Sequence, residues 1–226
     1  MEAFAFHNHA GEERYARHWP HAAPHGTLVL VHGYAEHSGR YLHVAEAAHD
    51  AGCAVWAYDQ YAHGQSPGTP GKLRDFDLLP ADLGAFCAHV QERSPGPCFV
   101  LGHSMGGLVA LRALQTGRIA PDGLVLSSPF IAPNEEVPAF LNALAPLVAA
   151  ALPFLPVFKL GIEKLSRDPQ VVEAARADPL YCRRPIDAGT GHALQSAIAA
   201  CQGAFAEVGV PFLAMHGTAD QLAPVS

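Results

Sequence analysis

The stretch CFVLGHSMGGLVALRALQT, residues 98–116, indicates the fold of this chain more strongly than any other. Cys98–Leu101 is an apolar run of strand length, and Met105–Thr116 has the composition of a helix. Between them, Gly102-His103-Ser104-Met105-Gly106 matches G-x-S-x-G, the pattern of a tight strand-to-helix turn that exposes a strained serine. Side chains at the two glycines would clash with such a turn. The alternative is an ordinary glycine-rich loop, which the flanking strand and helix disfavour.

Short apolar runs recur on both sides of this stretch. They are Thr27–Val31, Ala54–Tyr58, Gly123–Leu126 and Pro211–Met215. Such runs are typical of parallel strands that are buried on both faces, and the helix-like stretches Tyr41–Ala51 and Leu79–Glu92 lie between them. The alternation predicts an α/β fold, with a mostly parallel sheet and helices on both faces. Glu13–Trp19 is a candidate antiparallel strand at the start.

The segment after Gly123–Leu126 breaks the alternation, because it is rich in Pro and Ala and holds helix-like pieces without a clear strand. We expect a helical cap insertion at 130–195, between core parts at 1–129 and 196–226. Within it, Val137–Phe158 carries no charge and is long enough for a transmembrane helix. It contains the prolines Pro138, Pro146, Pro153 and Pro156. These prolines, and the position between core strands, favour apolar cap helices instead.

The composition supports a buried core and argues against some partners. Of the 226 residues, 50% are hydrophobic and 15% are charged, which argues against disorder. A net charge of −7 without a basic run argues against nucleic acid as a partner. The five cysteines are scattered and form no CxxC pair, and the start shows no signal-peptide pattern, so we expect a reducing, cytoplasmic location.

No cofactor motif is visible, since HExxH, Walker and GxGxxG patterns are all absent from the sequence. His18, His21 and His25 lie close together among prolines, and a metal site is conceivable there. Their spacing suits neither a helix face nor a strand face, so a solvated turn is the preferred interpretation. We therefore expect no cofactor and no metal.

Ser104 is the predicted nucleophile. The negative charge that develops during its attack needs two backbone N–H groups aimed at one point. Met105 directly follows the serine and supplies one, and Tyr34, in the loop after the first apolar run, is the expected second. Asp220 follows the run Pro211–Met215 and is the expected acid of a catalytic triad, with a turn aspartate as the alternative.

The histidine that activates the serine should follow the acid, after one more strand. Only Gln221–Ser226 comes after Asp220, so we expect a strand, a loop and a helix, on the order of 40 residues, to be absent. Their absence would leave Pro211–Met215 as an unpaired apolar edge that is prone to self-association. It would also leave the chain nearly inactive.

Other histidines are weaker candidates for the base. His32 precedes Ser104 in the chain and is interpreted as structural. His216 lies at the end of its strand, and we expect it to point away from the serine. His103 and His192 stay open as substitutes.

Two motifs together resemble the monoacylglycerol lipase and lysophospholipase branch of the α/β-hydrolases. They are His32-Gly33-Tyr34-Ala35-Glu36-His37-Ser38-Gly39-Arg40-Tyr41 and Gly102-His103-Ser104-Met105-Gly106-Gly107. Further similarity lies in Asp59…Gly64-Gln65-Ser66, Leu165-Ser166-Arg167-Asp168-Pro169, Asp178-Pro179-Leu180 and Gly217-Thr218-Ala219-Asp220. The resemblance runs from about Glu13 to the end. It implies the α/β-hydrolase fold, with Ser104 as nucleophile, Asp220 as acid, and the N–H groups of Tyr34 and Met105 as the oxyanion hole.

The resemblance also implies that Glu36 and Arg40 help to organise the loop beside the glycerol end of a substrate. An internal ion pair that merely shapes the loop is an equal alternative. The apolar cap implied by the family contacts lipid, which fits Val137–Phe158. We therefore expect peripheral contact with membranes or micelles through the cap.

The leading functional hypothesis is hydrolysis of a lipid carboxylic ester, from a monoacylglycerol or lysophospholipid, through an acyl-enzyme on Ser104. A small-ester carboxylesterase is the second possibility, because triad chemistry does not choose the acyl length. A third belongs to another class: a lipid-binding relic that keeps the pocket without the catalysis.

Overall fold

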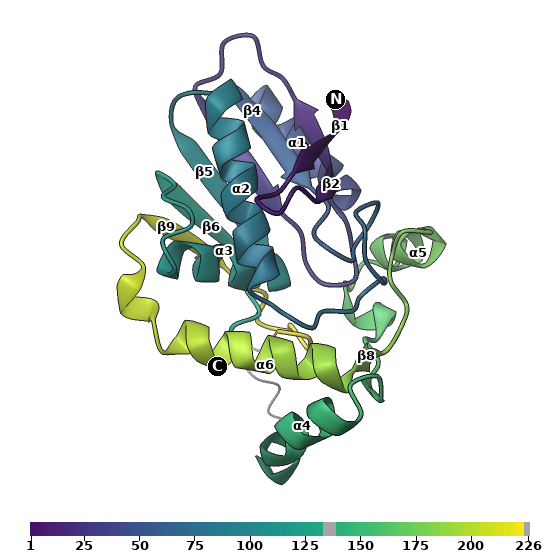
Figure 1. Cartoon of the computed structure of the whole chain (residues 1–226). Helices are drawn as coiled ribbons and strands as arrows, with labels where there is room; N and C mark the ends of the chain where they lie inside the picture. The colour runs from purple at the N-terminus through teal and green to yellow at the C-terminus, as the bar shows by residue number, and fades with distance from the viewer. Residues whose placement is uncertain (133–138, 224–226) are drawn as a thin grey trace.

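The computed structural model describes residues 1–132 and 139–223, and seven of its strands form one sheet (Figure 1). In chain order they are β1 Glu2–His7, β2 Glu13–Trp19, β3 Gly26–Val31, β4 Cys53–Tyr58, β5 Cys98–His103, β6 Gly123–Ser127 and β9 Phe212–Met215. Their order in the sheet is β1-β2-β4-β3-β5-β6-β9. The strands from β4 to β9 pair in parallel, whereas β2 pairs antiparallel with both of its neighbours.

The sheet confirms the predicted α/β fold, and each predicted strand is present with ends that differ by no more than a residue or two. The candidate strand Glu13–Trp19 is also confirmed. Strand β1 was not predicted, because it is not a continuous apolar run. It pairs with β2, and its Phe4 and Phe6 pack toward the core.

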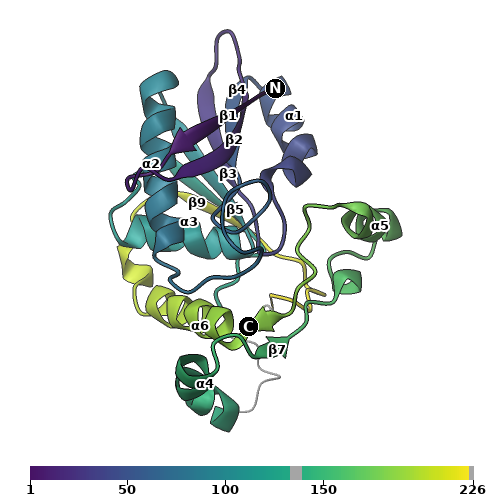
Figure 2. The ribbon, with the colours of Figure 1, turned by 45° about the vertical axis from the view of Figure 1, so that its right-hand side comes forward.

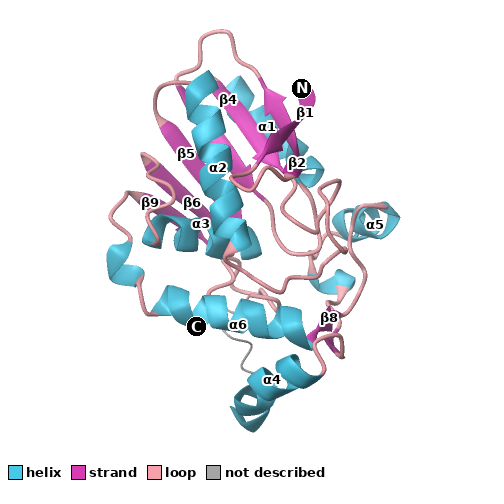
Figure 3. Ribbon diagram, viewed as in Figure 1, coloured by secondary structure: helices cyan, strands magenta, loops and turns pink. Residues whose placement is uncertain are grey.

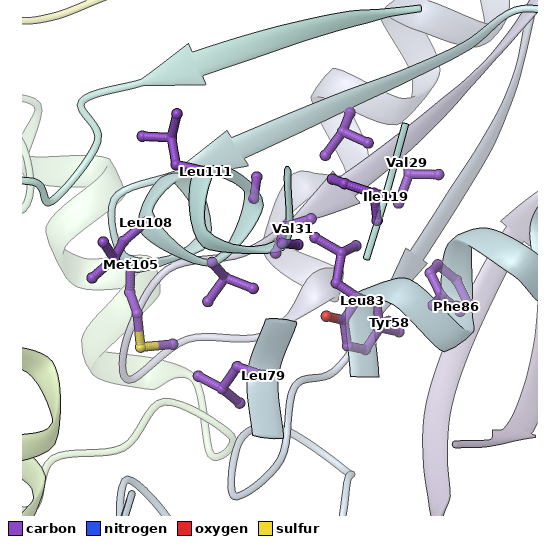
Figure 4. Packing of buried hydrophobic residues seen from close by; sticks show 14 of the residues in the cluster. Val29, Val31, Tyr58, Leu79, Leu83, Phe86, Met105, Leu108, Leu111 and Ile119 are labelled. Carbon is purple, nitrogen blue, oxygen red and sulfur yellow. The ribbon is translucent and has the colours of Figure 1, made fainter. Parts of the chain in front are cut away.

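Helices cover both faces of the sheet (Figures 2 and 3). They are α1 Leu42–Asp50 on one face, and α2 Leu78–Arg93 and α3 Met105–Gln115 on the other. Strand β3 shows why both faces need a cover, because its successive apolar side chains point to opposite faces of the sheet. Val29 and Val31 join Leu83 and Leu108 in the larger apolar cluster (Figure 4), whereas Leu30 packs in the cluster of α1.

Between β6 and β9 the chain leaves the sheet and forms the cap. Its described elements are α4 Ala139–Ala151, β7 Pro156–Phe158, a 3-10 helix at Ile162–Lys164, α5 Pro169–Ala177, β8 Ile186–Asp187 and α6 Ala188–Gln202. β7 and β8 pair antiparallel in a small separate sheet. The cap is mostly helical, as expected, and its two strands left no pattern in the sequence because they are only three and two residues long.

The uncharged stretch Val137–Phe158 is not one helix. Val137 and Pro138 lie outside the described residues, α4 ends at Ala151, and β7 follows. None of the described helices has the length and apolar character that crossing a membrane requires. Large apolar side chains are exposed on this stretch instead. They are Leu144, Leu147, Leu152, Phe154, Leu155, Val157 and Phe158.

Helix α6 links the cap to the core, since it packs against α3 and also against α4. It runs across residue 195, where we place the end of the cap. The division into 1–129, 130–195 and 196–226 therefore stays a prediction.

Candidate active site

Ser104 lies at the turn between β5 and α3, with φ 51° and ψ −119°. A positive φ is uncommon for a residue that carries a side chain. The glycines of the turn leave no room for a Cβ: one on Gly102 would lie 2.5 Å from the Gly106 carbonyl oxygen, and one on Gly106 would lie 2.1 Å from that of Val31. The strained turn and the need for both glycines are thus confirmed.

Backbone hydrogen bonds hold this turn in place. The N–H of Ser104 donates to the carbonyl of Ser127 at 3.0 Å, and the carbonyl of Ser104 accepts from Phe130 N–H at 3.0 Å. The N–H groups of Met105 and Tyr34 have no hydrogen-bond partner among residues 1–132 and 139–223. Both donors are therefore available to a ligand, as an oxyanion hole requires.

The loop Gly33–Arg40 lies directly beside the serine, since a Cβ on Gly33 would be 3.2 Å from the Cβ of Ser104. Glu36 organises this loop. Its Oε1 accepts hydrogen bonds from Gly33 N–H at 2.6 Å and from the Tyr41 hydroxyl at 2.6 Å. Its Oε2 lies 3.4 Å from Arg40 Nε. The internal ion pair is therefore formed, and a role of the two side chains beside the glycerol end stays a prediction.

The Glu36 carboxylate is charged at neutral pH. Burial by itself raises its pKa, but the imidazoles of His103 and His32 and the hydrogen bonds from Tyr41 and Gly33 outweigh this effect. The pKa of Glu36 therefore lies below its usual value. A fixed negative charge beside the serine suits a polar, hydroxyl-bearing ligand group better than an acyl chain.

Asp59 holds the Gly33–Arg40 loop in place through hydrogen bonds. Its buried carboxylate accepts from Ser38 N–H at 2.9 Å and from Gln65 N–H at 2.8 Å. Arg17 Nη1 lies 3.3 Å from the same side chain. The segment Asp59…Gly64-Gln65-Ser66, which carried part of the family resemblance, thus has a structural role next to the site.

The four histidines considered as a base differ in their surroundings. His32 is buried, with Nδ1 2.7 Å from Gly33 O, and its Nε2 accepts from Gln60 N–H at 2.9 Å, which agrees with the structural interpretation. His216 Nε2 lies 2.6 Å from the carbonyl of Ala223. His103 and His192 line the cavity that contains Ser104, and His216 is not among the residues that line it.

Asp220 follows β9 in a turn. Its Oδ1 accepts from the N–H groups of Leu222 at 2.8 Å and Ala223 at 2.9 Å, as a turn aspartate does. Its Oδ2 lies 3.6 Å from His216 Nε2. Asp220 nevertheless lines the same cavity as Ser104. Both interpretations of this carboxylate therefore fit its contacts.

A cavity of about 1200 Å³ lies between the Ser104 turn and the cap. Five of the predicted site residues line it: Ser104, Asp220, Tyr34, Met105 and Glu36. Arg40 is not among the lining residues. The cap contributes apolar side chains, among them Val148, Leu155 and Phe158. A cavity of this size, with a few polar groups at one place, suits a ligand with a long apolar part.

Metal ligands do not gather in the described part of the chain, where no group of three or more His, Cys, Asp or Glu side chains could hold an ion. His18 lies in β2, and its ring stacks on Trp56 with 3.6 Å between centroids. The solvated-turn interpretation is therefore wrong for His18, because the sheet provides an aromatic partner that the local sequence does not reveal.

Sequence reasoning assigned no role to His37 or Asp178, although both lie in motifs that carry the family resemblance. The structure brings the two side chains together, with His37 Nε2 2.8 Å from Asp178 Oδ2. They are 141 positions apart. Membership in the motifs was the available signal, and the contact itself depends on how the cap sits on the core.

Comparison with known proteins agrees with this architecture. Residues 22–226 match the family described as serine aminopeptidase, S33. The monoacylglycerol lipase of Mycolicibacterium smegmatis is 37% identical over 210 residues, which cover 92% of this chain and 74% of that protein. The monoglyceride lipase of Homo sapiens is 34% identical, over 95% of this chain and 72% of that protein. A solved structure, the monoacylglycerol lipase of Paleococcus ferrophilus, superposes with a TM-score of 0.80 at 32% identity, over 94% of this chain and 80% of that one.

A mostly parallel sheet, helices on both faces and a G-x-S-x-G turn beneath a cap define an α/β-hydrolase. The chain belongs to the serine aminopeptidase S33 family and, within it, to the branch of the monoacylglycerol lipases. The predicted fold class and family resemblance are thereby confirmed.

Proposed function

We propose that this protein hydrolyses carboxylic esters of lipids, with a monoacylglycerol or lysophospholipid as substrate. The observation that carries the proposal is one cavity of about 1200 Å³ in which Ser104 and Asp220 lie together with an apolar cap wall. The names of the relatives support the same substrate class. The family description names an aminopeptidase, but an apolar wall matches an acyl chain better than a peptide.

In the proposed reaction, the Ser104 hydroxyl attacks the ester carbonyl. The N–H groups of Tyr34 and Met105 bind the oxygen that becomes negative, which lowers the barrier. The alcohol leaves, the acyl group stays on the serine, and water releases the fatty acid. A histidine base, which Asp220 would orient, would take the proton of the Ser104 hydroxyl and give it to the leaving alcohol.

The two ends of the substrate would lie in different surroundings. The acyl chain would lie against the apolar cap side chains, and the alcohol would lie toward Glu36, whose carboxylate accepts hydrogen bonds from hydroxyl groups. The exposed apolar residues of the cap would touch the lipid surface from which the substrate comes.

Ser104→Ala tests the nucleophile. The change removes one oxygen, so the circular dichroism spectrum and melting temperature should stay the same, whereas hydrolysis of p-nitrophenyl esters and labelling by a fluorophosphonate should both disappear. A variant that keeps its esterase activity would refute the assignment. A chain that never labels, yet still binds a fatty acid, would instead support the lipid-binding relic.

Acyl-chain length separates the proposal from a small-ester carboxylesterase. With p-nitrophenyl esters, kcat/KM should rise from butyrate to decanoate if the cap wall binds the acyl chain. A steady fall over that series would favour the carboxylesterase.

The source of the base needs a separate measurement. Loss of a triad histidine costs about 10⁶ in turnover elsewhere. A version extended with a final strand, histidine loop and helix from a relative should therefore be far more active than the 226-residue chain. Comparable turnover would show that a histidine of this chain, such as His103 or His192, acts as the base.

A further inference from the structure

One carboxylate of the cap, that of Asp178, contacts the Gly33–Arg40 loop. Its Oδ2 lies 2.8 Å from His37 Nε2 and 3.6 Å from Arg40 Nη1. Its Oδ1 accepts from the N–H of Leu180 at 2.9 Å, which fixes the orientation of the carboxylate. The side chain is 16% exposed. Asp178 therefore makes two charged or polar contacts to the loop from a defined position.

The same segment of the cap makes a second link to the loop. The N–H of Cys182 donates to the carbonyl of Ala35 at 2.7 Å. The ring of Tyr181 packs on Ala35, and the guanidinium of Arg40 lies 5.6 Å from the centre of that ring. Ala35 has φ 68°, a conformation that a non-glycine residue holds only when its surroundings enforce it.

A chain of contacts continues from the cap to the peptide group beside the serine. Asp178 pairs with Arg40, Arg40 pairs with Glu36 at 3.4 Å, and Glu36 accepts from Gly33 N–H at 2.6 Å. The next N–H in the chain is that of Tyr34. The position of this donor therefore depends on a network that ends in the cap.

We propose that Asp178 is a positioning residue, which holds the Gly33–Arg40 loop so that the Tyr34 N–H points at the reacting oxygen. The inference rests on the proposed oxyanion role of Tyr34. The oxyanion hole is then complete only while the cap segment 178–182 contacts the Gly33–Arg40 loop. A cap that lifts away would take the carboxylate with it, and the loop would lose its support.

The charge state of Asp178 agrees with this role. Partial burial raises its pKa, but the hydrogen bond with His37, that from Leu180 N–H and the charge of Arg40 outweigh burial and hold the pKa of Asp178 below its usual value. The group is therefore a carboxylate at neutral pH, and Asp178→Asn removes its charge with little change in shape.

Amide hydrogen exchange on the 226-residue chain tests the proposal without any need for turnover. In Asp178→Asn, the amides of residues 33–40 should exchange about tenfold faster, whereas those of α3 should not change. Asp178→Glu, which keeps the charge, should recover part of the protection. Unchanged exchange of residues 33–40 in Asp178→Asn would overturn the proposal.

Asp168→Ala is the control, because Asp168 caps the other end of α5, where its side chain accepts from Gln170 N–H at 2.8 Å and has no contact to residues 33–40 among the described residues, and alanine cannot replace that cap. It should loosen the start of α5 and leave residues 33–40 as they are. Equal loosening of the loop by both variants would overturn the proposal, since the loop would then follow the general stability of the cap.

Kinetics give a second readout. Hydrolysis that survives without a triad base comes from the oxyanion hole and from substrate binding. With p-nitrophenyl butyrate, kcat of Asp178→Asn should fall about tenfold while KM stays unchanged. A raised KM with unchanged kcat would assign Asp178 to binding and overturn the proposal. If the extended version with the histidine loop of a relative also shows no hydrolysis, the proposed function fails, and the exchange experiment still decides the role of Asp178.

Discussion

Ser104 holds a backbone conformation that costs a residue with a side chain about 1–3 kcal/mol. Hydrogen bonds at its N–H and its carbonyl stabilise this conformation. Gly102 and Gly106 allow the backbones of β5, α3 and β3 to approach one another at distances that a Cβ would prevent. Single residues therefore decide whether the turn can form, and the turn decides where the serine lies.

Gly106→Ala should show this directly. The new Cβ would lie 2.1 Å from the carbonyl oxygen of Val31, so the backbone has to shift. We expect a loss of at least about 2 kcal/mol in the free energy of unfolding, measured with urea, and loss of labelling at Ser104.

Gly203→Ala provides the control, because Gly203 has φ −71° and its nearest neighbours to a Cβ lie at 3.6 Å. That change should be neutral or stabilise the protein by up to about 1 kcal/mol. Equal effects of the two substitutions would contradict the steric explanation of the turn.

His63 links the stability of the site region to pH. Its ring is buried against His32 and Tyr34, behind the Gly33–Arg40 loop, and its Nδ1 lies 2.9 Å from the carbonyl of Tyr61. Burial, with a smaller contribution from His32, lowers the pKa of His63 to about 4. The imidazole is therefore neutral in the folded protein at pH 5 to 7 and becomes protonated in the unfolded chain below about 6.5.

Acidification should therefore destabilise the protein in a defined window. The contribution of His63 is complete above pH 6.5 and is lost as the pH falls from 6.5 toward 4, because the unfolded chain binds the extra proton. From pH 7 to pH 5 we expect a loss of about 2 kcal/mol in the free energy of unfolding from this group. In His63→Gln the loss of stability between pH 7 and pH 5, measured with urea, should be smaller by about this 2 kcal/mol, so the slope of stability against pH should be shallower. An unchanged slope would assign the pH dependence to other groups.

Among the elements, α4 and β7 present the most exposed apolar side chains of the cap. Phe154, Val157 and Phe158 follow one another at the end of the uncharged stretch, and all are more than two-fifths exposed. Val157 and Phe158 also line the cavity, together with Leu155. An exposed apolar patch beside the mouth of a lipid-sized cavity is typical of a surface that rests on a bilayer or micelle.

Vesicle flotation tests this surface. The protein should float with phosphatidylcholine vesicles, and Val157→Glu should weaken that binding about tenfold, because a charge replaces an apolar contact. Val171→Glu is the matched control, since Val171 is a 41% exposed valine on α5. If both variants bind vesicles as tightly as the parent chain, the patch does not touch lipid.

On the scale of the whole molecule, β9 is the last strand in the order of the described sheet. β9 pairs with β6, and Phe212, Leu213 and Met215 are 60%, 56% and 47% exposed. Within the described residues, β9 therefore pairs with β6 alone and leaves these apolar side chains exposed. Its N–H and C=O groups can pair with a strand of another chain, which natural proteins usually prevent with charges or a cover.

For a polypeptide of these 226 residues, self-association through β9 is the expected result. Sedimentation velocity should show dimers or larger species that increase with concentration, and Leu213→Lys should shift the distribution toward monomer. Leu147→Lys changes a leucine of the cap that is 68% exposed, and it should leave the distribution unchanged. A parent chain that stays monomeric at high concentration would contradict this prediction.

The central strands and the Ser104 turn could be predicted from the sequence, because each depends on a pattern of residues that are neighbours in the chain. A buried parallel strand needs a continuous apolar run such as Thr27–Val31, and the turn needs glycine two residues before and after its serine. Strand β1 and the β7–β8 pair were missed, because short or alternating strands depend on partners that are distant in the sequence.

The sequence by itself determined the fold class, the family and the residue types at the candidate site. Tertiary structure alone decided which of those residues meet: that Ser104, Asp220 and Glu36 line one cavity while Arg40 does not, that His18 stacks on Trp56, and that Asp178 reaches His37. The physical reason is the distance along the chain over which each kind of interaction acts. Strand and turn patterns reflect backbone preferences over a few neighbouring residues, whereas these contacts exist only after the cap and the sheet have packed and excluded water between them.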